Sequence, residues 1–231
     1  MLKVRVTQLE AFRRFLYREP YATEEALLES FSGVFKENEY TRIGTGFHSL
    51  VERGDISDHI TDVIGEHNPV EKEIRVIVID EKHIVYNQQQ IDAALQYKAE
   101  ITPCFHEVKM LKSYNIGELI HVSGTCDVLQ GMIIRDIKTK YSDLRSIEDY
   151  TRSYQWRLYC DMFEVTDFSY DVFQFVGYNK DVHGYDVSGL SIRRHDPIDC
   201  LTYSTMQQDI HTLLHEFKNY VHYKGIEKYF Q

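Results

Sequence analysis

The chain has 231 residues, about one and a half times the usual domain size, so we expect one globular domain spanning 1–231. Hydrophobic residues make up 43% and charged residues 27%, which excludes disorder, collagen and coiled coil as the main state. No apolar run reaches the roughly 18 residues of a membrane span, and the first residues lack a secretory apolar stretch, so we expect a cytoplasmic protein. The net charge of −10 opposes indiscriminate binding to a polyanion.

Hydrophobic periodicity and turn residues predict helices and strands that alternate along the chain. In chain order they are a helix over 6–16 capped by Thr7, a helix over 23–35, a helix from Gly46 to Gly54, a hairpin over 74–80 and 83–86, a helix over 88–98, meander strands over 105–112, 118–128 and 132–140, a helix over 146–163, strands over 170–178 and 185–193 around Gly184, and a final helix over 200–222. This order predicts an α/β or α+β fold with one mixed central sheet flanked by helices.

One segment stands out by its charge. Residues 55–82 hold eight acidic and three basic residues, and we expect an acidic surface insertion at about this position, beginning with an excursion over 55–73. The four cysteines are Cys104, Cys126, Cys160 and Cys200, and none of them are two residues apart as in many metal sites. We therefore expect reduced thiols.

The strongest chemical pattern lies in the second and third meander strands. A turn centred on Gln130-Gly131 would pair Asp127 with Ile134 and place Asp127 on one face with Asp136 and Lys138. The diagonal step between the two aspartates spans about 7–8 Å, which two carboxylates can close around a hard cation such as Mg²⁺. The plain alternative is a solvated ion pair between Asp136 and Lys138. The neighbouring Ile133-Ile134 favours burial, where unpaired charges are costly.

The chain resembles the RecB-type nuclease domains of the PD-(D/E)XK superfamily over most of its length. Five segments carry the resemblance, and they are the opening helix Val6-Thr7-Gln8-Leu9-Glu10-Ala11-Phe12-Arg13-Arg14-Phe15-Leu16-Tyr17, the G-x-x-x-H pattern Gly44-Thr45-Gly46-Phe47-His48, the G-x-x-D pattern Gly124-Thr125-Cys126-Asp127, the D-x-K pattern Asp136-Ile137-Lys138 and the Q-x-x-x-Y pattern Gln155-Trp156-Arg157-Leu158-Tyr159. The resemblance implies a restriction-endonuclease-like core with a mixed sheet.

The resemblance also implies roles for particular residues. His48, Asp127, Asp136 and the Ile137 carbonyl would bind one or two Mg²⁺ or Mn²⁺ ions, and Lys138 would position or activate the attacking water. On a helix Gln155 and Tyr159 share a face, where they would contact DNA or orient Lys138. Without the other motifs, Tyr159 reads as a core residue and His48 as a satisfied, partly buried histidine.

Two departures from the family pattern bear on these expectations. Cys126 stands where the superfamily name has proline. Relatives that carry an iron-sulfur cluster use one cysteine near the first helix and three near the C-terminus, whereas residues 1–103 here contain none and the end has only Cys200. We therefore expect no iron-sulfur cluster.

Together these observations predict a metal-dependent DNA exonuclease, a hydrolase of linear or single-stranded DNA in recombination, repair or phage-type DNA processing. Candidate phosphate contacts are Arg13, Arg14, Arg152 and Arg157, with Tyr154 or Tyr159 stacking on bases, although each arginine alone reads as a surface charge. We expect DNA as the partner, with a recombination or replication protein as a further one, and no membrane. The acidic insertion would lie away from the DNA or mimic it. A non-catalytic binding protein of the same fold and a site-specific endonuclease remain the alternatives.

Overall fold

The computed structural model describes residues 1–33, 37–54, 60–63, 74–79, 82–144, 146–177, 179–182, 185–187 and 191–231. Side chains are described for these residues except 60–63, 74–79, 82–85, 179–182 and 185–187. No helix in the described part of the chain has both the length and the apolar character needed to cross a membrane.

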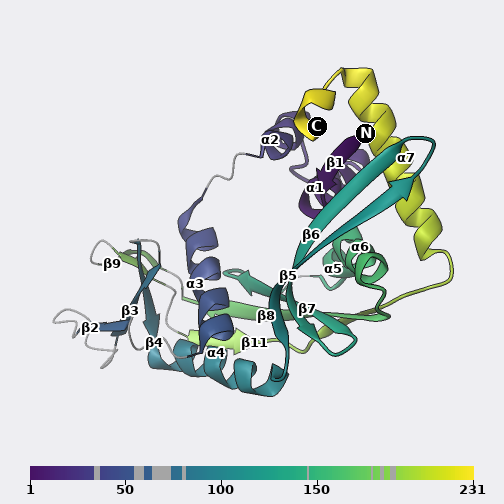
Figure 1. Ribbon diagram of the computed structural model, residues 1–231. Coiled ribbons are helices and arrows are strands. Elements are labelled where there is room, and N and C mark those ends of the chain that lie inside the picture. The colour runs from purple at the N-terminus through teal and green to yellow at the C-terminus, as the bar shows by residue number, and fades with distance from the viewer. Residues whose placement is uncertain are drawn as a thin grey trace.

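The secondary-structure elements follow one another along the chain as shown in Figure 1. They are β1 (Leu2–Arg5), α1 (Val6–Leu16), α2 (Glu24–Ser32), α3 (Glu39–Arg53), β2 (Ile60–Val63), β3 (Ile74–Ile79), β4 (Lys82–Asn87), α4 (Gln88–Ile101), β5 (Phe105–Asn115), β6 (Leu119–Gln130), β7 (Ile133–Lys140), α5 (Glu148–Thr151), α6 (Tyr154–Phe163), β8 (Asp167–Val176), β9 (Asn179–Val182), β10 (Tyr185–Val187), β11 (Ser191–Arg194), β12 (Ile198–Leu201), α7 (Met206–Lys224) and a 3₁₀ turn, η2 (Glu227–Phe230).

A mixed α/β architecture with a central sheet flanked by helices is present, as expected. The large sheet has the order β1-β6-β7-β8-β11, with β5 on β6 and β12 on β8. Strands β5, β6 and β7 form the expected antiparallel meander, and β8 lies parallel to β7. Because parallel neighbours need a crossover, α5 and α6 connect β7 to β8 across one face of the sheet. Strand β1, which the sequence did not predict, pairs in parallel with β6.

The expectation of one mixed sheet is wrong, because a second sheet has the order β2-β3-β4-β10-β9. Its β3–β4 hairpin was predicted. Strand β2, which pairs with β3, precedes the hairpin, and β10, which pairs with β4, lies about 100 positions further along the chain. Three of its strands, β2, β3 and β4, lie in or overlap the segment expected to be an acidic insertion. The side chains of 55–85 and the turn at Gly184 lie outside the described residues.

Two clusters of buried side chains pack on the large sheet. One joins α1, α2, α6 and α7 and includes Phe12, Tyr170 and Phe217. The other joins α3 and α4 and includes Phe47 and Phe173. Along β8 the residues Phe168, Tyr170 and Val172 contact the first cluster while Phe173 and Phe175 contact the second, as strand alternation requires. Helices thus cover the sheet from two sides (Figure 1).

Several predicted helix boundaries differ from the structure. Arg5, not Thr7, is the N-cap of α1, because the helix follows β1 directly and the Gln8 side chain accepts a hydrogen bond from the Arg5 N–H. Helix α3 begins at Glu39 after an Asn38 cap, well before Gly46. Both Gly44 and Gly46 lie within this helix. The predicted helix over 146–163 is divided into α5 and α6, and Ser153 caps α6. Residues 198–201 form β12, so α7 starts only at Met206.

Candidate metal and nucleic-acid site

The register between β6 and β7 differs from the predicted one by two residues. Val128 pairs with Arg135 and Leu129 with Ile134, so Asp127 is not opposite Ile134. The turn consists of Gly131 and Met132, and Gly131 has the positive φ of 60° that a type II′ turn requires at its first central position. A shift of two residues keeps every side chain on its face. If this register continued by one more pair beyond Val128 and Arg135, Asp127 would lie opposite Asp136.

The ladder between these strands stops before that pair is reached. Along this edge of β6, β1 pairs up to Ser123 and β7 pairs from Val128 onward, so that residues 124–127 have neither strand beside them. Polar side chains supply partners instead. The Asp127 carboxylate accepts a hydrogen bond of 2.8 Å from the Ile137 N–H, and the Tyr159 hydroxyl donates one of 2.8 Å to the Thr125 carbonyl.

Gly124 is needed for this arrangement because the Tyr159 ring lies directly against it. A β-carbon at Gly124 would lie 2.5 Å from Tyr159 Cε1 and 2.9 Å from a Val6 methyl group. Tyr159 is buried and stacks on Phe168. The predicted DNA-contact role of Tyr159 is therefore wrong, since its ring is in the core and its hydroxyl holds the β6 backbone.

Asp136 on β7 is buried and lies between two polar partners. Its Oδ1 accepts a hydrogen bond of 2.9 Å from Gln155 Nε2, and its Oδ2 forms an ion pair with Lys138 Nζ. Burial and the carboxylates of Asp127 and Asp171 raise the pKa of Asp136 to about 7, against the opposing effect of Lys138. Gln155 therefore holds Asp136. The sequence had instead predicted that Gln155 contacts DNA or orients Lys138.

Lys138 remains charged in this environment. Burial disfavours the ammonium form, but the carboxylates of Asp136 and Asp127 outweigh it and raise the pKa of Lys138. The ammonium group also lies 5.8 Å from the centroid of the Tyr170 ring, within the range of a cation–π contact. A permanently protonated amine can stabilise negative charge on a phosphate but cannot accept a proton from water.

His48 reaches the site from α3 because that helix lies unusually close to β7. A β-carbon at Gly44 would lie 2.7 Å from the Thr139 hydroxyl oxygen, so glycine permits the approach. One turn further along α3, His48 Nδ1 lies 3.8 Å from Asp127 Oδ2. Burial lowers the pKa of His48, with Lys138 acting in the same direction and Asp127 and the Ile137 backbone opposing it. The imidazole is thus kept in the neutral form that a metal ligand requires.

A third side chain, which sequence reasoning missed, joins this pair. Ligand atoms of His48, Glu107 and Asp127 all lie within 4.8 Å of one another, and this is the only such group of three among the described residues. Asp136 does not belong to this group, because its oxygens face Lys138 and Gln155. Glu107 lies in β5, where alternation of polar and apolar residues gave it the pattern of an ordinary exposed strand residue.

A cavity of about 450 Å³ opens beside Lys138 and Gln155. Its wall is formed by α1 with the turn after it and by α5 with the start of α6, including Arg14, Tyr21 and Arg152. Tyr21 is 95% exposed at the rim. Lys138 is the residue of the D-x-K pattern that lines this cavity, and two exposed arginines lie on its walls.

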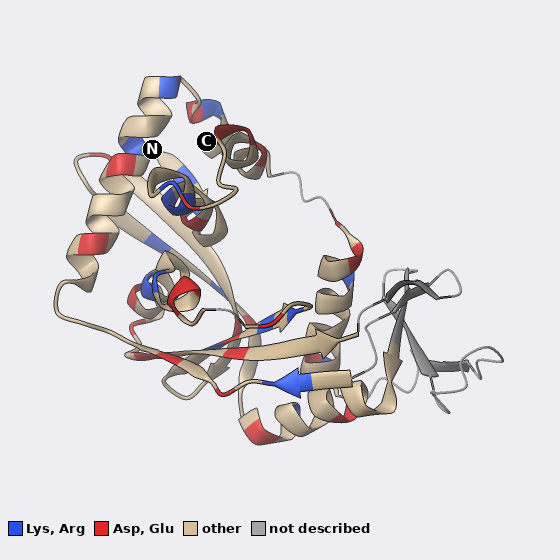
Figure 2. Cartoon of the chain, turned by 180° about the vertical axis from the view of Figure 1, so that it is seen from behind, with Lys and Arg blue, Asp and Glu red and all other residues tan. Residues whose placement is uncertain are grey.

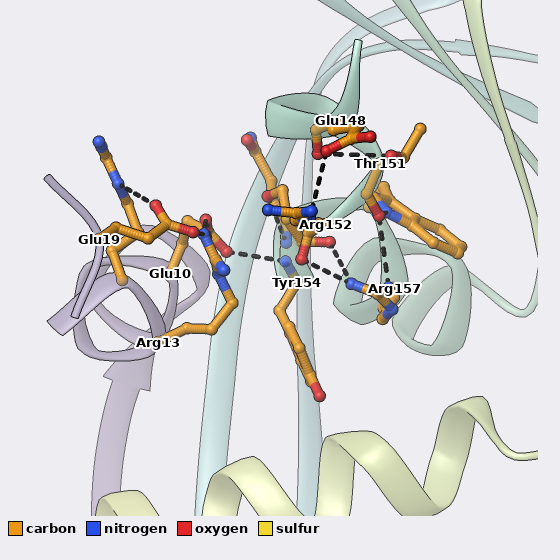
Figure 3. A network of polar contacts seen from close by, with 12 residues as sticks. Glu10, Arg13, Glu19, Glu148, Thr151, Arg152, Tyr154 and Arg157 are labelled. Atoms are coloured by element: carbon orange, nitrogen blue, oxygen red, sulfur yellow. Dashed lines mark hydrogen bonds and ion pairs between the residues drawn. The ribbon is translucent and has the colours of Figure 1, made fainter. Parts of the chain in front are cut away.

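Internal partners occupy the guanidinium groups of two of the four candidate phosphate contacts (Figure 3). Arg13 is buried and forms ion pairs of 2.8 Å with Glu10 and 2.7 Å with Glu19. Arg157 donates to the backbone carbonyls of Thr151, Arg152 and Ser153 and to the Tyr203 hydroxyl. The Glu10 carboxylate also accepts a hydrogen bond from the Tyr154 N–H, which joins α1 to the start of α6.

The other two arginines are exposed at the cavity. Arg14 pairs with Glu19, and Arg152 pairs with Glu148 one turn away. Exposed pairs of this kind contribute about 0–1 kcal/mol, so a phosphate can replace the carboxylate at little cost. Figure 2 shows basic and acidic residues interspersed along the described elements.

Comparison with known proteins does not assign the chain to a family. No protein-family model and no curated protein sequence matches it. Among solved structures the chain is similar to the one titled "Crystal structure of SSO0001", with 16% identity over 94% of this chain and 74% of that chain and a TM-score of 0.45. A likeness of this size identifies neither a family nor a function.

Proposed function

We propose that this chain is a divalent-cation-dependent deoxyribonuclease of the PD-(D/E)XK type, acting as an exonuclease on linear or single-stranded DNA. The observation that carries the proposal is the ion pair between the buried Asp136 and the partly exposed Lys138, next to Asp127 and His48. Burying a charge is costly unless a partner compensates it. Buried charged groups with strongly shifted pKa values cluster at functional sites.

The side chains suit a hard or borderline divalent cation. The Asp127 carboxylate, the Ile137 carbonyl and the neutral His48 imidazole would hold it, and the imidazole shifts preference from Mg²⁺ towards Mn²⁺. The Asp136 carboxylate would join them by giving up its contact with Lys138 or Gln155. A bound cation would polarise the phosphodiester and favour hydroxide over water as the nucleophile.

The remaining residues of the site have roles that follow from their contacts. Lys138 would offset the charge that develops on the phosphate oxygens, since it stays protonated. Gln155 would fix the Asp136 carboxylate through its hydrogen bond. The cavity beside Lys138 would take the DNA strand, with Arg14 and Arg152 at its phosphates and the exposed Tyr21 against a base.

The proposal is tested with purified protein and four DNA substrates, namely end-labelled linear and closed circular DNA, each single- and double-stranded. Reactions contain Mg²⁺ or Mn²⁺, with EDTA as the control, and the variants are Lys138→Ala and Asp136→Asn. We expect loss of linear DNA only, in the presence of metal, abolished by both substitutions.

Other outcomes would assign the site differently. Nicking of closed circles would make the protein an endonuclease. Binding of DNA without cleavage in either metal would contradict the proposal and favour a non-catalytic binding protein of the same fold.

A further inference from the structure

We infer that Glu107 is a ligand of the divalent cation held by His48 and Asp127, so that this position offers one imidazole nitrogen and two carboxylates. This inference rests on the proposed function only in taking the His48–Asp127 pair as metal-binding. Glu107 belongs to none of the sequence motifs that identified the site. Its assignment comes from the arrangement of β5 against β6.

The first observation is the convergence of three donor side chains from three elements. His48 comes from α3, Glu107 from β5 and Asp127 from β6, and their ligand atoms lie within 4.8 Å of one another. Donors separated by this distance can be bridged by one ion, because metal–oxygen and metal–nitrogen bonds are about 2.0–2.4 Å long.

The second observation is the charge balance around these carboxylates. Asp136 is paired with Lys138, whereas no lysine or arginine forms an ion pair with Glu107 or Asp127 in the described part of the chain. Glu107 is exposed, but a carboxylate oxygen of it lies within 4.8 Å of the ligand atoms of Asp127 and His48, so the two carboxylates repel each other. A divalent cation would relieve that repulsion.

The backbone of Glu107 is consistent with this role. Its φ is 51°, in the left-handed region that residues other than glycine rarely adopt. The β5–β6 ladder runs in one register on both sides, with His106 opposite Val128 and Val108 opposite Cys126, but the step between them is unpaired. The strand thus departs from regular geometry at the residue that faces Asp127.

The test is calorimetric titration of the full chain with MnCl₂ at neutral pH, which needs no substrate. Glu107→Gln removes the ligand charge and keeps the shape of the side chain. Glu52→Gln is the matched control, because Glu52 is an exposed neighbour that carries the same charge but does not belong to the donor group. Circular dichroism verifies that each variant is folded.

We expect Glu107→Gln to weaken Mn²⁺ binding by about 10-fold or more, with Glu52→Gln within about 2-fold of the parent. Equal affinity of Glu107→Gln and the parent, together with a loss in Asp127→Asn, would overturn the inference and leave the proposed function intact. Mn²⁺ binding that depends on Glu107 in a protein that cleaves no DNA would support the inference and contradict the proposed function. A parent that binds no Mn²⁺ would contradict both.

Discussion

A β-carbon at Gly44 would lie 2.7 Å from the hydroxyl oxygen of Thr139, which means that α3 approaches β7 more closely than a larger residue at position 44 allows while Thr139 keeps its present position. The approach matters because His48 follows Gly44 by one turn on the same face of α3. Position 44 therefore controls how near the imidazole comes to Asp127.

Gly44→Ala should move α3 away from β7 and lower the free energy of unfolding by about 1–3 kcal/mol, the usual cost of overpacking. It should also weaken Mn²⁺ binding by displacing His48. The double variant Gly44→Ala/Thr139→Ala should recover both properties, since the nearest remaining atom, the Thr139 β-carbon, is 3.9 Å away. Urea unfolding and calorimetry measure the two effects, and absence of recovery in the double variant would contradict this explanation.

Tyr159→Phe separates a structural role from a catalytic one. The substitution keeps the ring against Gly124 but leaves the Thr125 carbonyl without its hydrogen bond, which should cost about 1–2 kcal/mol of unfolding free energy. Cleavage at a temperature where the variant is folded should change much less than in Lys138→Ala. A variant of parental stability that has lost its activity would instead make the Tyr159 hydroxyl a catalytic group.

The raised pKa of Asp136, about 7, predicts that cation binding depends on pH. Below that pKa the carboxyl is protonated and a cation must displace the proton, so Mn²⁺ affinity should fall by up to tenfold per pH unit as pH decreases. Above it the affinity should level off. Calorimetry between pH 6 and 8, in two buffers with different ionisation enthalpies, measures both the affinity and the proton release. Asp136→Asn should remove this proton release, and an affinity in the parent that does not vary with pH would refute the assignment.

Arg13 and Arg14 are adjacent in sequence, but their environments predict opposite effects. Arg13→Met would leave Glu10 without its ion-pair partner and Glu19 with Arg14 alone, at a cost of about 3 kcal/mol or more in unfolding free energy. Arg14→Met should change stability by less than about 0.5 kcal/mol. In a fluorescence assay with a single-stranded oligonucleotide, Arg14→Met should reduce the affinity and the salt dependence of binding. Equal affinity of the parent and Arg14→Met would exclude this wall of the cavity from the DNA path.

Much of the site could be predicted because its determinants are local in sequence. The D-x-K strand, the helix that carries His48 and the meander all follow from periodicity and turn residues, which act over a few neighbours. The predicted register was wrong by two residues, but it still placed Asp127 and Asp136 on the same face of the sheet. Side chains alternate with a period of two, so a shift of two residues does not change the face on which they lie.

The parts that could not be predicted depend on contacts between distant segments. Strand β1 has four residues, too few for a periodic signal, and its partner β6 lies more than 100 residues away. The positive φ of Glu107 has no local marker, since glycine or asparagine would be the expected residue there. Arg13 is exposed or buried according to where Glu19 and α6 lie, which the sequence of α1 does not encode.

The most direct test of the central claim compares DNA cleavage and Mn²⁺ binding in the parent and in Lys138→Met. Methionine keeps the length of the side chain and removes the charge that the phosphate requires. We predict that Lys138→Met binds Mn²⁺ but cleaves a linear single-stranded substrate at least about 100-fold more slowly than the parent. Cleavage at the parental rate would contradict the claim that this site performs the hydrolysis.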